Sequence, residues 1–137
     1  MQHDLTIICD DVRHEVGHKV TIVGIYDEAI LLAKFPARIA KLCLFQRWKG
    51  SDQPSSFRLE VKGNALGSTF AVEGKRDETN YNPAATRAQL TVAFSPFDVL
   101  SAGECEFVTY LGADSSPSHV HRLEFRLDPG LGSKVDS

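Results

Sequence analysis

Two histidines near the C-terminal end of the chain have the spacing of paired metal ligands. His119 and His121 are two residues apart in a segment of alternating polarity, and side chains at that spacing on a strand share one face. Imidazole nitrogens bind zinc and related transition metals. The pair is also in phase with Leu123 and Phe125, so it equally fits the half-buried start of an inward strand face. This second interpretation is the simpler one. We therefore predict no metal and no cofactor, and keep His119 and His121 as the metal candidates.

Paired acidic residues follow the first two apolar runs and could supply oxygen ligands for Ca²⁺. Asp10 and Asp11 come after the first run, and Asp27 and Glu28 come after the second. If the two runs form an antiparallel hairpin, the pairs lie at opposite ends of it and cannot form one site. We interpret them as residues that end strands and begin turns.

Nucleophile motifs are missing from the sequence. The chain has three cysteines, Cys9, Cys43 and Cys105, each inside an apolar run, and no Cys-x-x-Cys or Gly-x-Ser-x-Gly pattern. The glycines at 63–67 do not match a phosphate-binding loop. Buried, reduced thiols are the expectation, and the sequence predicts that the protein is not an enzyme.

The longest polar insertion, residues 74–83, is the best candidate for a contact surface. It contains Arg76 and Tyr81, and Arg87 follows it closely. Long polar loops are exposed, and tyrosine and arginine are enriched where proteins bind one another. We therefore predict that Arg76, Tyr81 and Arg87 contact a protein partner.

Overall charge and hydropathy exclude several classes of partner. Fifteen basic and 18 acidic residues give a net charge of −3, which lacks the basic footprint of a nucleic-acid-binding protein. No apolar run approaches the length of a membrane span. The first residues, Met-Gln-His-Asp, do not resemble the basic start of a signal peptide. We expect a cytoplasmic protein without a nucleic-acid or membrane partner.

Alternating polarity predicts about eight short strands and no long amphipathic helix. The first two form a hairpin, with residues 10–19 as its connection. Residues 29–33 fit either an edge strand or one helical turn, and residues 97–100 fit a turn of helix or a packed loop. The predicted strands cover residues 5–9, 20–26, 39–48, 57–62, 69–73, 88–94, 105–111 and 120–127.

This pattern predicts an all-β fold, a single-domain antiparallel β-sandwich of Greek-key, Ig-like or C2-like type. A closed barrel is the alternative. The sandwich is favoured because strands of alternating polarity need a second apolar layer to cover them. The domain is expected to span residues 1–130, followed by a flexible tail at 131–137.

The opening residues carry a family resemblance. Ile-Ile-Cys-Asp-Asp-Val-Arg (7–13) and Gly-His-Lys-Val-Thr-Ile-Val-Gly-Ile-Tyr (17–26), followed by Phe-Pro and Lys-Leu-Cys-Leu (41–44), resemble a family of small uncharacterised bacterial and phage β-domain proteins. The resemblance covers the first third of the chain well and the C-terminal part loosely. It implies a small β domain of phage or prophage origin and no assigned activity.

Two functional hypotheses follow. The first is a non-enzymatic β-sandwich module that acts through protein contacts, including self-association through a sheet edge or face. The alternative is a small-ligand or metal-binding domain whose site lies at one end of the sandwich.

Overall fold

The computed structural model describes residues 1–79 and 81–131, and these residues form eleven strands. Four of them build one sheet, here called sheet A: β1 (Gln2–His14), β2 (Val20–Tyr26), β5 (Leu42–Lys49) and β8 (Arg87–Phe94). Five build sheet B: β3 (Ala29–Leu32), β6 (Ser56–Lys62), β7 (Phe70–Lys75), β10 (Gly103–Leu111) and β11 (His119–Leu127). The remaining two, β4 (Ala37–Ile39) and β9 (Phe97–Val99), pair with each other.

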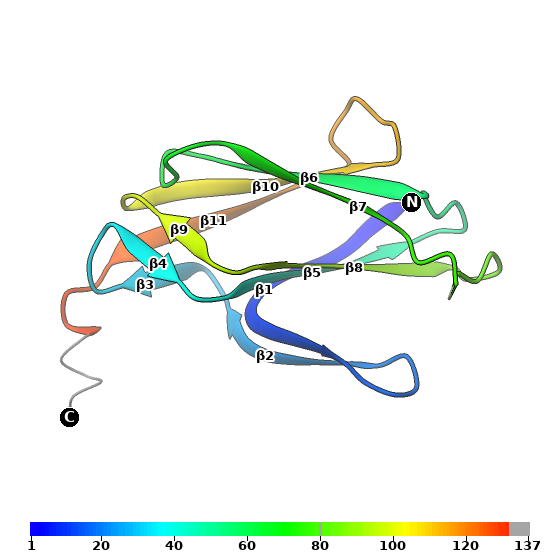
Figure 1. Cartoon of the computed structure of the whole chain (residues 1–137), viewed down its shortest axis with the longest axis horizontal. Helices are drawn as coiled ribbons and strands as arrows, with labels where there is room; N and C mark the ends of the chain where they lie inside the picture. The colour runs from blue at the N-terminus through cyan, green and yellow to red at the C-terminus, as the bar shows by residue number, and fades with distance from the viewer. Residues whose placement is uncertain (80, 132–137) are drawn as a thin grey trace.

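Sheets A and B face each other, which confirms the predicted all-β sandwich (Figure 1). Sheet A has the order β2-β1-β5-β8 and sheet B the order β3-β11-β10-β6-β7. Every strand pair is antiparallel except β3 with β11, which run parallel. The fold is therefore a sandwich with one parallel pair at the edge of sheet B.

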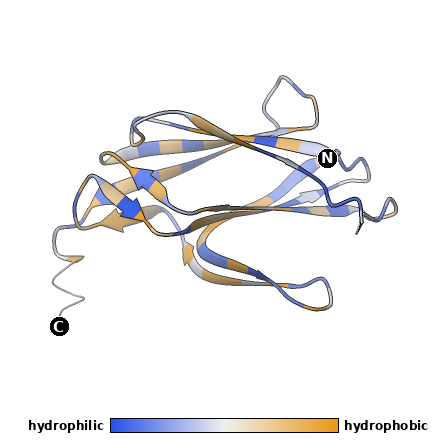
Figure 2. Cartoon of the chain, in the orientation of Figure 1, coloured by the Kyte–Doolittle hydropathy of each residue, from blue (hydrophilic) through white to orange (hydrophobic). Residues whose placement is uncertain are grey.

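The core lies between the two sheets and follows the alternation of the sequence. Leu59, Val92 and Phe125 are 0%, 6% and 1% exposed, while polar residues between the inward positions face solvent. Figure 2 shows this alternation as bands of colour along the strands. Each sheet has one apolar face, and packing the two faces together removes both from contact with water. This burial is the main favourable contribution to the free energy of folding.

β5 is buried on both faces because a third layer lies beneath sheet A. β1 pairs with β5 only as far as Cys9, opposite Cys43, but pairs with β2 as far as His14. Beyond Cys9 the β1–β2 hairpin leaves the sheet and lies on the side away from sheet B (Figure 1). There Asp11 of the hairpin accepts a 2.7 Å hydrogen bond from Lys41, which directly precedes β5.

The predicted hairpin connection at residues 10–19 was wrong. The strand continues to His14, and only residues 15–19 form the connection, closed by a 2.8 Å hydrogen bond from Glu15 N to Lys19 O. The second half of this hairpin is a two-stranded ribbon outside the sandwich. Asp11 and Arg13 can therefore occupy a strand without an apolar partner on the next layer.

Residues 97–99, interpreted from sequence as a helical turn or loop, form strand β9. Phe97 is 1% exposed, and its ring lies 5.5 Å from that of Phe94 and 6.0 Å from that of Phe125. Residues 29–32 form a strand too. Strands of three or four residues are too short to show a polarity alternation. They are recognised only from their hydrogen-bonded partners, which lie far away in the sequence.

The described part of the chain continues past β11 to Leu131. Residues 132–137 of the predicted tail lie outside the described residues, so that tail remains a prediction. No helix in the described part of the chain is long and apolar enough to cross a membrane.

Candidate protein-contact site

The polar loop after β7 is held by Arg76. The guanidinium carbon of Arg76 lies 3.7 Å from the ring centre of Tyr81, its Nε bonds Glu78 at 2.9 Å, and its Nη1 donates to the carbonyl of Gln53 at 3.0 Å. The backbone N–H of Arg76 donates to Ser55. A cation stacked on an aromatic face is stabilised by the ring quadrupole. Arg76 and Tyr81 therefore lie together, with Arg76 fixing the loop and Tyr81 half-exposed beside it.

Arg87 is placed apart from that stack, at the start of β8. Its Nη1 lies 3.8 Å from Asp4, whose other oxygen lies 3.3 Å from Lys49. The backbone carbonyl of Arg87 accepts a 3.0 Å hydrogen bond from the Gln53 side chain. Gln53 thus connects the Arg76 loop to β8, although the Arg87 side chain itself joins a different set of charges.

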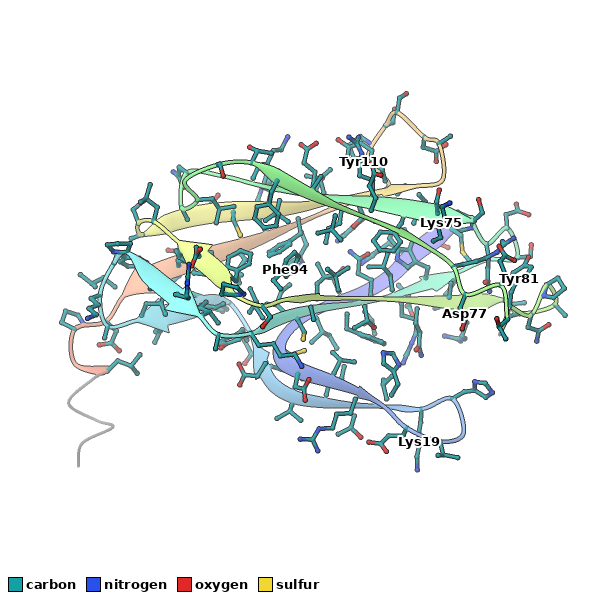
Figure 3. All side chains as sticks on the ribbon, in the orientation of Figure 1. Lys19, Lys75, Asp77, Tyr81, Phe94 and Tyr110 are labelled. Atoms are coloured by element: carbon teal, nitrogen blue, oxygen red, sulfur yellow. The ribbon has the colours of Figure 1, made fainter. Side chains whose placement is uncertain are left out.

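A shallow groove of about 740 Å³ lies next to this loop. Arg58 and Tyr110 are cross-strand partners on β6 and β10, and the Arg58 guanidinium lies 4.3 Å from the ring centre of Tyr110. Leu59, the next residue along β6, is fully buried, so Arg58 and Tyr110 project from the outer face of sheet B. Figure 3 shows Tyr110 on that face and Tyr81 and Asp77 at the adjoining end of the sandwich. The groove is lined by Ser56, Phe57, Arg58, Glu73, Gly74, Lys75, Tyr110, Gly112, Ala113 and Asp114.

Gly74 shapes the floor of the groove. A Cβ atom at this position would lie 2.4 Å from Cε1 of Phe57, its cross-strand partner on β6. The missing side chain lets the Phe57 ring lie across β7, while Phe57 also packs against the core. A larger residue at position 74 would displace this ring.

Both signs of charge line the groove. Arg58 and Lys75 carry positive charge, and Glu73 and Asp114 carry negative charge. A mixed lining does not favour a polyanion over a polycation. Together with two arginine–tyrosine stacks, it has the aromatic and polar composition found where proteins bind one another.

Sequence reasoning found the loop at 74–83, with Lys75, Arg76 and Tyr81, but it did not bring Arg58 and Tyr110 together as part of the site. Arg58 and Tyr110 occupy ordinary outward positions of strands that alternate in polarity. The available signal was weak: aromatic Tyr110 stands in an outward phase where a polar residue is usual. Only the pairing of β6 with β10 brings it to Arg58.

His119 and His121 lie on one strand as predicted, but the neighbour of His119 is another histidine ring. The rings of His3 and His119 are stacked, with centres 3.5 Å apart and planes 6° from parallel, whereas His121 is 6.4 Å from His119. Metal-binding lone pairs lie in the ring planes, so those of two stacked rings do not converge. Within residues 1–79 and 81–131, no group of three or more His, Cys, Asp or Glu side chains is placed to hold a metal ion.

The environment of these histidines favours their neutral form. Burial, followed by the neighbouring His3 and His121, lowers the pKa of His119 to about 4. Burial also lowers the pKa of His3 and of His121. The Nε2 atom of His3 lies 2.7 Å from the Thr6 hydroxyl. The arrangement is that of a packed contact between β1 and β11.

Each carboxylate of the Asp10–Asp11 pair has its own partner. Asp10 accepts a 2.7 Å hydrogen bond from the Tyr26 hydroxyl, and burial together with this bond raises the pKa of Tyr26 to about 12. Asp11 bonds Lys41 at 2.7 Å and Arg13 at 3.3 Å, which lowers the pKa of Asp11. Contrary to the expectation from sequence, both lie inside the β1–β2 ladder rather than at its end.

All three cysteines are buried and free, as predicted. Cys9 and Cys43 are direct cross-strand partners. Burial is the main cause that raises the pKa of Cys9 to about 11 and of Cys105 to about 12, and it also raises the pKa of Cys43. Such thiols remain protonated and are weak nucleophiles.

Comparison with known families gives one match over most of the chain. Residues 4–126 match a family described as "Family of unknown function (DUF6941)". This match is much longer than the resemblance carried by the opening residues. Comparison with curated proteins finds no match.

Proposed function

The chain belongs to the DUF6941 family, and because that family has no assigned activity, we propose a function from the site geometry. We propose that the protein is a non-enzymatic β-sandwich module that binds a protein partner through the groove on sheet B. The opening motif suggests a phage or prophage gene as its source.

The observation that supports this proposal is the Arg58–Tyr110 stack that lines the groove. The stack holds Tyr110 in one orientation while leaving part of the ring accessible beside Lys75 and Asp114. A fixed aromatic ring loses little conformational entropy on binding, which is one reason why tyrosine is frequent among residues that dominate binding energy.

The Arg76 loop extends this surface. Its hydrogen bonds to Gln53 and Ser55 place the loop against the connection that leads into β6. Tyr81 therefore adds a second aromatic side chain at the adjoining end of the sandwich, held by Arg76 in the way that Arg58 holds Tyr110. A partner that contacts both rings would bind a larger surface than the groove alone provides.

Tyr110→Ala is the variant that tests the proposal. Wild-type chain is used as bait in a lysate of the source organism, and each captured protein is then purified and titrated against the wild type and the variant. Loss of Tyr110 is expected to weaken binding at least about tenfold, equal to about 1.4 kcal/mol. Arg122→Ala is the matched control, because Arg122 lies on β11 of the same sheet but outside the groove. The dissociation constant of the partner for this variant should stay within about twofold of the wild-type value.

Two results would contradict the proposal. One is a partner whose affinity is unchanged in both Tyr110→Ala and Tyr81→Ala while the variants remain folded. The other is specific turnover of a substrate that is lost when the loop is altered. The ligand- or metal-binding alternative predicts a rise in melting temperature on adding a metal ion and its reversal by chelator.

A further inference from the structure

β2 is an edge strand without the usual protection against pairing with another chain. It ends sheet A, and its ladder partner is β1. Exposed edges are commonly protected by charged residues, proline or short length. The seven residues of β2, Val-Thr-Ile-Val-Gly-Ile-Tyr, contain no charge and no proline. β2 therefore presents backbone donors and acceptors at its free edge, on both sides of an irregularity at Gly24, whose φ is +69°.

The same strand exposes apolar side chains. Val23 is 42% exposed and Ile25 is 56% exposed. They share one strand face with Thr21, while the opposite face, with Val20, Ile22 and Tyr26, is half-buried. A partner strand at this edge would bring its own side chains beside Val23 and Ile25 and remove apolar area from water.

The charges that flank β2 specify which partner strand fits. Lys19 precedes the strand and Asp27 follows it, and neither side chain takes part in an ion pair with another described residue. An antiparallel copy of β2 centred on Val23 would place Lys19 opposite Asp27 of the second copy at both ends. It would also place Thr21 opposite Ile25 of the second copy.

We propose that two copies of this chain associate through β2, antiparallel about a two-fold axis at Val23. The two β1–β2 ribbons then join into one four-stranded antiparallel sheet. A parallel, in-register pair would bring Lys19 against Lys19 and Asp27 against Asp27, and like charges at close range repel. Self-complementarity of this kind is what a two-fold symmetric interface requires.

Other sheet edges fit this role less well. β7 at one edge of sheet B carries Glu73 and Lys75, and β3 at the other edge is four residues long. β8, the other edge of sheet A, begins with Arg87, and its exposed positions carry Arg87, Gln89 and Ala93 instead of large apolar side chains. The β2 edge also lies away from the groove. Figure 3 shows Lys19 on the β1–β2 hairpin and Tyr110 on the opposite side of the molecule. The dimer is therefore independent of the proposed partner groove and can be tested separately.

Solution mass gives the first test. The chain of 15.1 kDa is expected to show twice that mass in sedimentation equilibrium at high concentration. Val23→Lys places two positive charges at the two-fold axis and should raise the dissociation constant at least about tenfold. Leu127→Lys is the control, because Leu127 is similarly exposed, at 53%, on β11, and its dimer should be unchanged.

Cross-linking tests the register. In the proposed dimer, residue 23 faces its own copy, and opposed residues have Cα atoms about 5 Å apart, within disulfide range. Val23→Cys should therefore form a covalent dimer under mild oxidation. Ile25→Cys should not, because its two copies would lie about 13 Å apart along the strands. The native cysteines are buried and provide the wild-type background.

A charge exchange supplies a test that retains the apolar strand. Lys19→Glu alone and Asp27→Lys alone should each weaken the dimer, and the double exchange should restore it. A wild-type chain that is monomeric at every concentration would overturn the proposal. So would a dimer insensitive to Val23→Lys, or cross-linking of Ile25→Cys as readily as Val23→Cys.

Discussion

Gln46 is the polar side chain that connects the two sheets at the centre of the sandwich. It is fully buried and so is Thr109 on β10. The Gln46 amide nitrogen lies 3.1 Å from the Thr109 hydroxyl and 3.2 Å from that of Thr6, and its carbonyl oxygen accepts from the Trp48 indole at 3.3 Å. A buried amide is tolerated in an apolar core only when such partners are present.

Gln46→Leu is expected to destabilise the protein by about 2–6 kcal/mol. The substitution keeps the volume roughly constant but leaves the Trp48 indole N–H and the Thr109 hydroxyl without their amide partner, at about 1–3 kcal/mol for each group. The free energy of unfolding measured in urea gives the value.

Thr91→Val is the matched control for that variant. The Thr91 hydroxyl is buried and has no hydrogen-bond partner within residues 1–79 and 81–131. Replacing it with a methyl group should therefore leave stability unchanged or raise it by about 1 kcal/mol. A loss in Thr91→Val as large as that in Gln46→Leu would show that volume, rather than bonding, decides the effect.

At the scale of single elements, the turn between β6 and β7 is fastened to the start of β10. The Asn64 side-chain oxygen accepts a 2.8 Å hydrogen bond from the backbone of Glu104, and Ala65 N donates to the Glu104 carbonyl at 3.1 Å. Gly63 and Asn64 begin the connection between β6 and β7, and its packing against β10 could not be read from neighbouring residues.

Gly63→Ala is expected to destabilise the protein by at least about 2 kcal/mol. Gly63 has φ +143°, and a Cβ atom there would lie 2.3 Å from the carbonyl oxygen of Glu104. This contact is with backbone, so no side-chain rotation relieves it.

Gly67→Ala provides the comparison within the same turn. No atom of residues 1–79 or 81–131 lies within 4 Å of a Cβ atom at this position, so the stability of this variant should stay within about 0.5 kcal/mol of wild type. Chemical denaturation of both variants measures the difference. Equal stability of the two alanine variants would contradict the close approach of Gly63 to β10.

At the scale of the whole molecule, stacked histidines join sheet A to sheet B. His3 lies on β1 and stacks on His119 of β11. The His3 ring also packs edge to face against Trp48, and this extends the contact to β5. Asp4 and His121 are the other titratable groups that act on these two rings. The contact is made between neutral rings, because burial lowers the pKa of each histidine.

Stability is therefore expected to fall as the pH is lowered from about 6.5 towards 4. His119 titrates near its ordinary pKa of 6.5 in the unfolded chain and at about 4 in the folded one, so the unfolded state binds protons first. The contribution of His119 to the free energy of unfolding is therefore complete above pH 6.5 and is lost as the pH falls from about 6.5 to about 4.

His119→Phe separates this effect from general acid denaturation. The variant retains a ring for stacking and removes the titrating group. The free energy of unfolding should fall less between pH 7 and pH 5 in this variant than in wild type. An identical pH dependence in both proteins would show that His119 does not titrate as its surroundings predict.

Sequence alternation by itself determined the class of fold and most inward positions. Leu59, Val92 and Phe125 are buried for the reason the pattern gives, since each strand must turn one apolar face away from water. It also determined that Arg76 and Tyr81 belong to one polar loop. These properties depend on residues close together in the chain, where a two-residue period is informative.

Only the tertiary structure decided which distant residues meet. A register shift between His3 and Leu5 changes the phase of β1, and His3 comes to lie on His119 while Thr6 faces Gln46. The Arg58–Tyr110 groove likewise depends on β6 pairing with β10, and the free edge of β2 on its place at the end of sheet A. Strand order and register are set by the packing of the whole domain, and the polarity pattern of one strand does not identify the strands that pair with it.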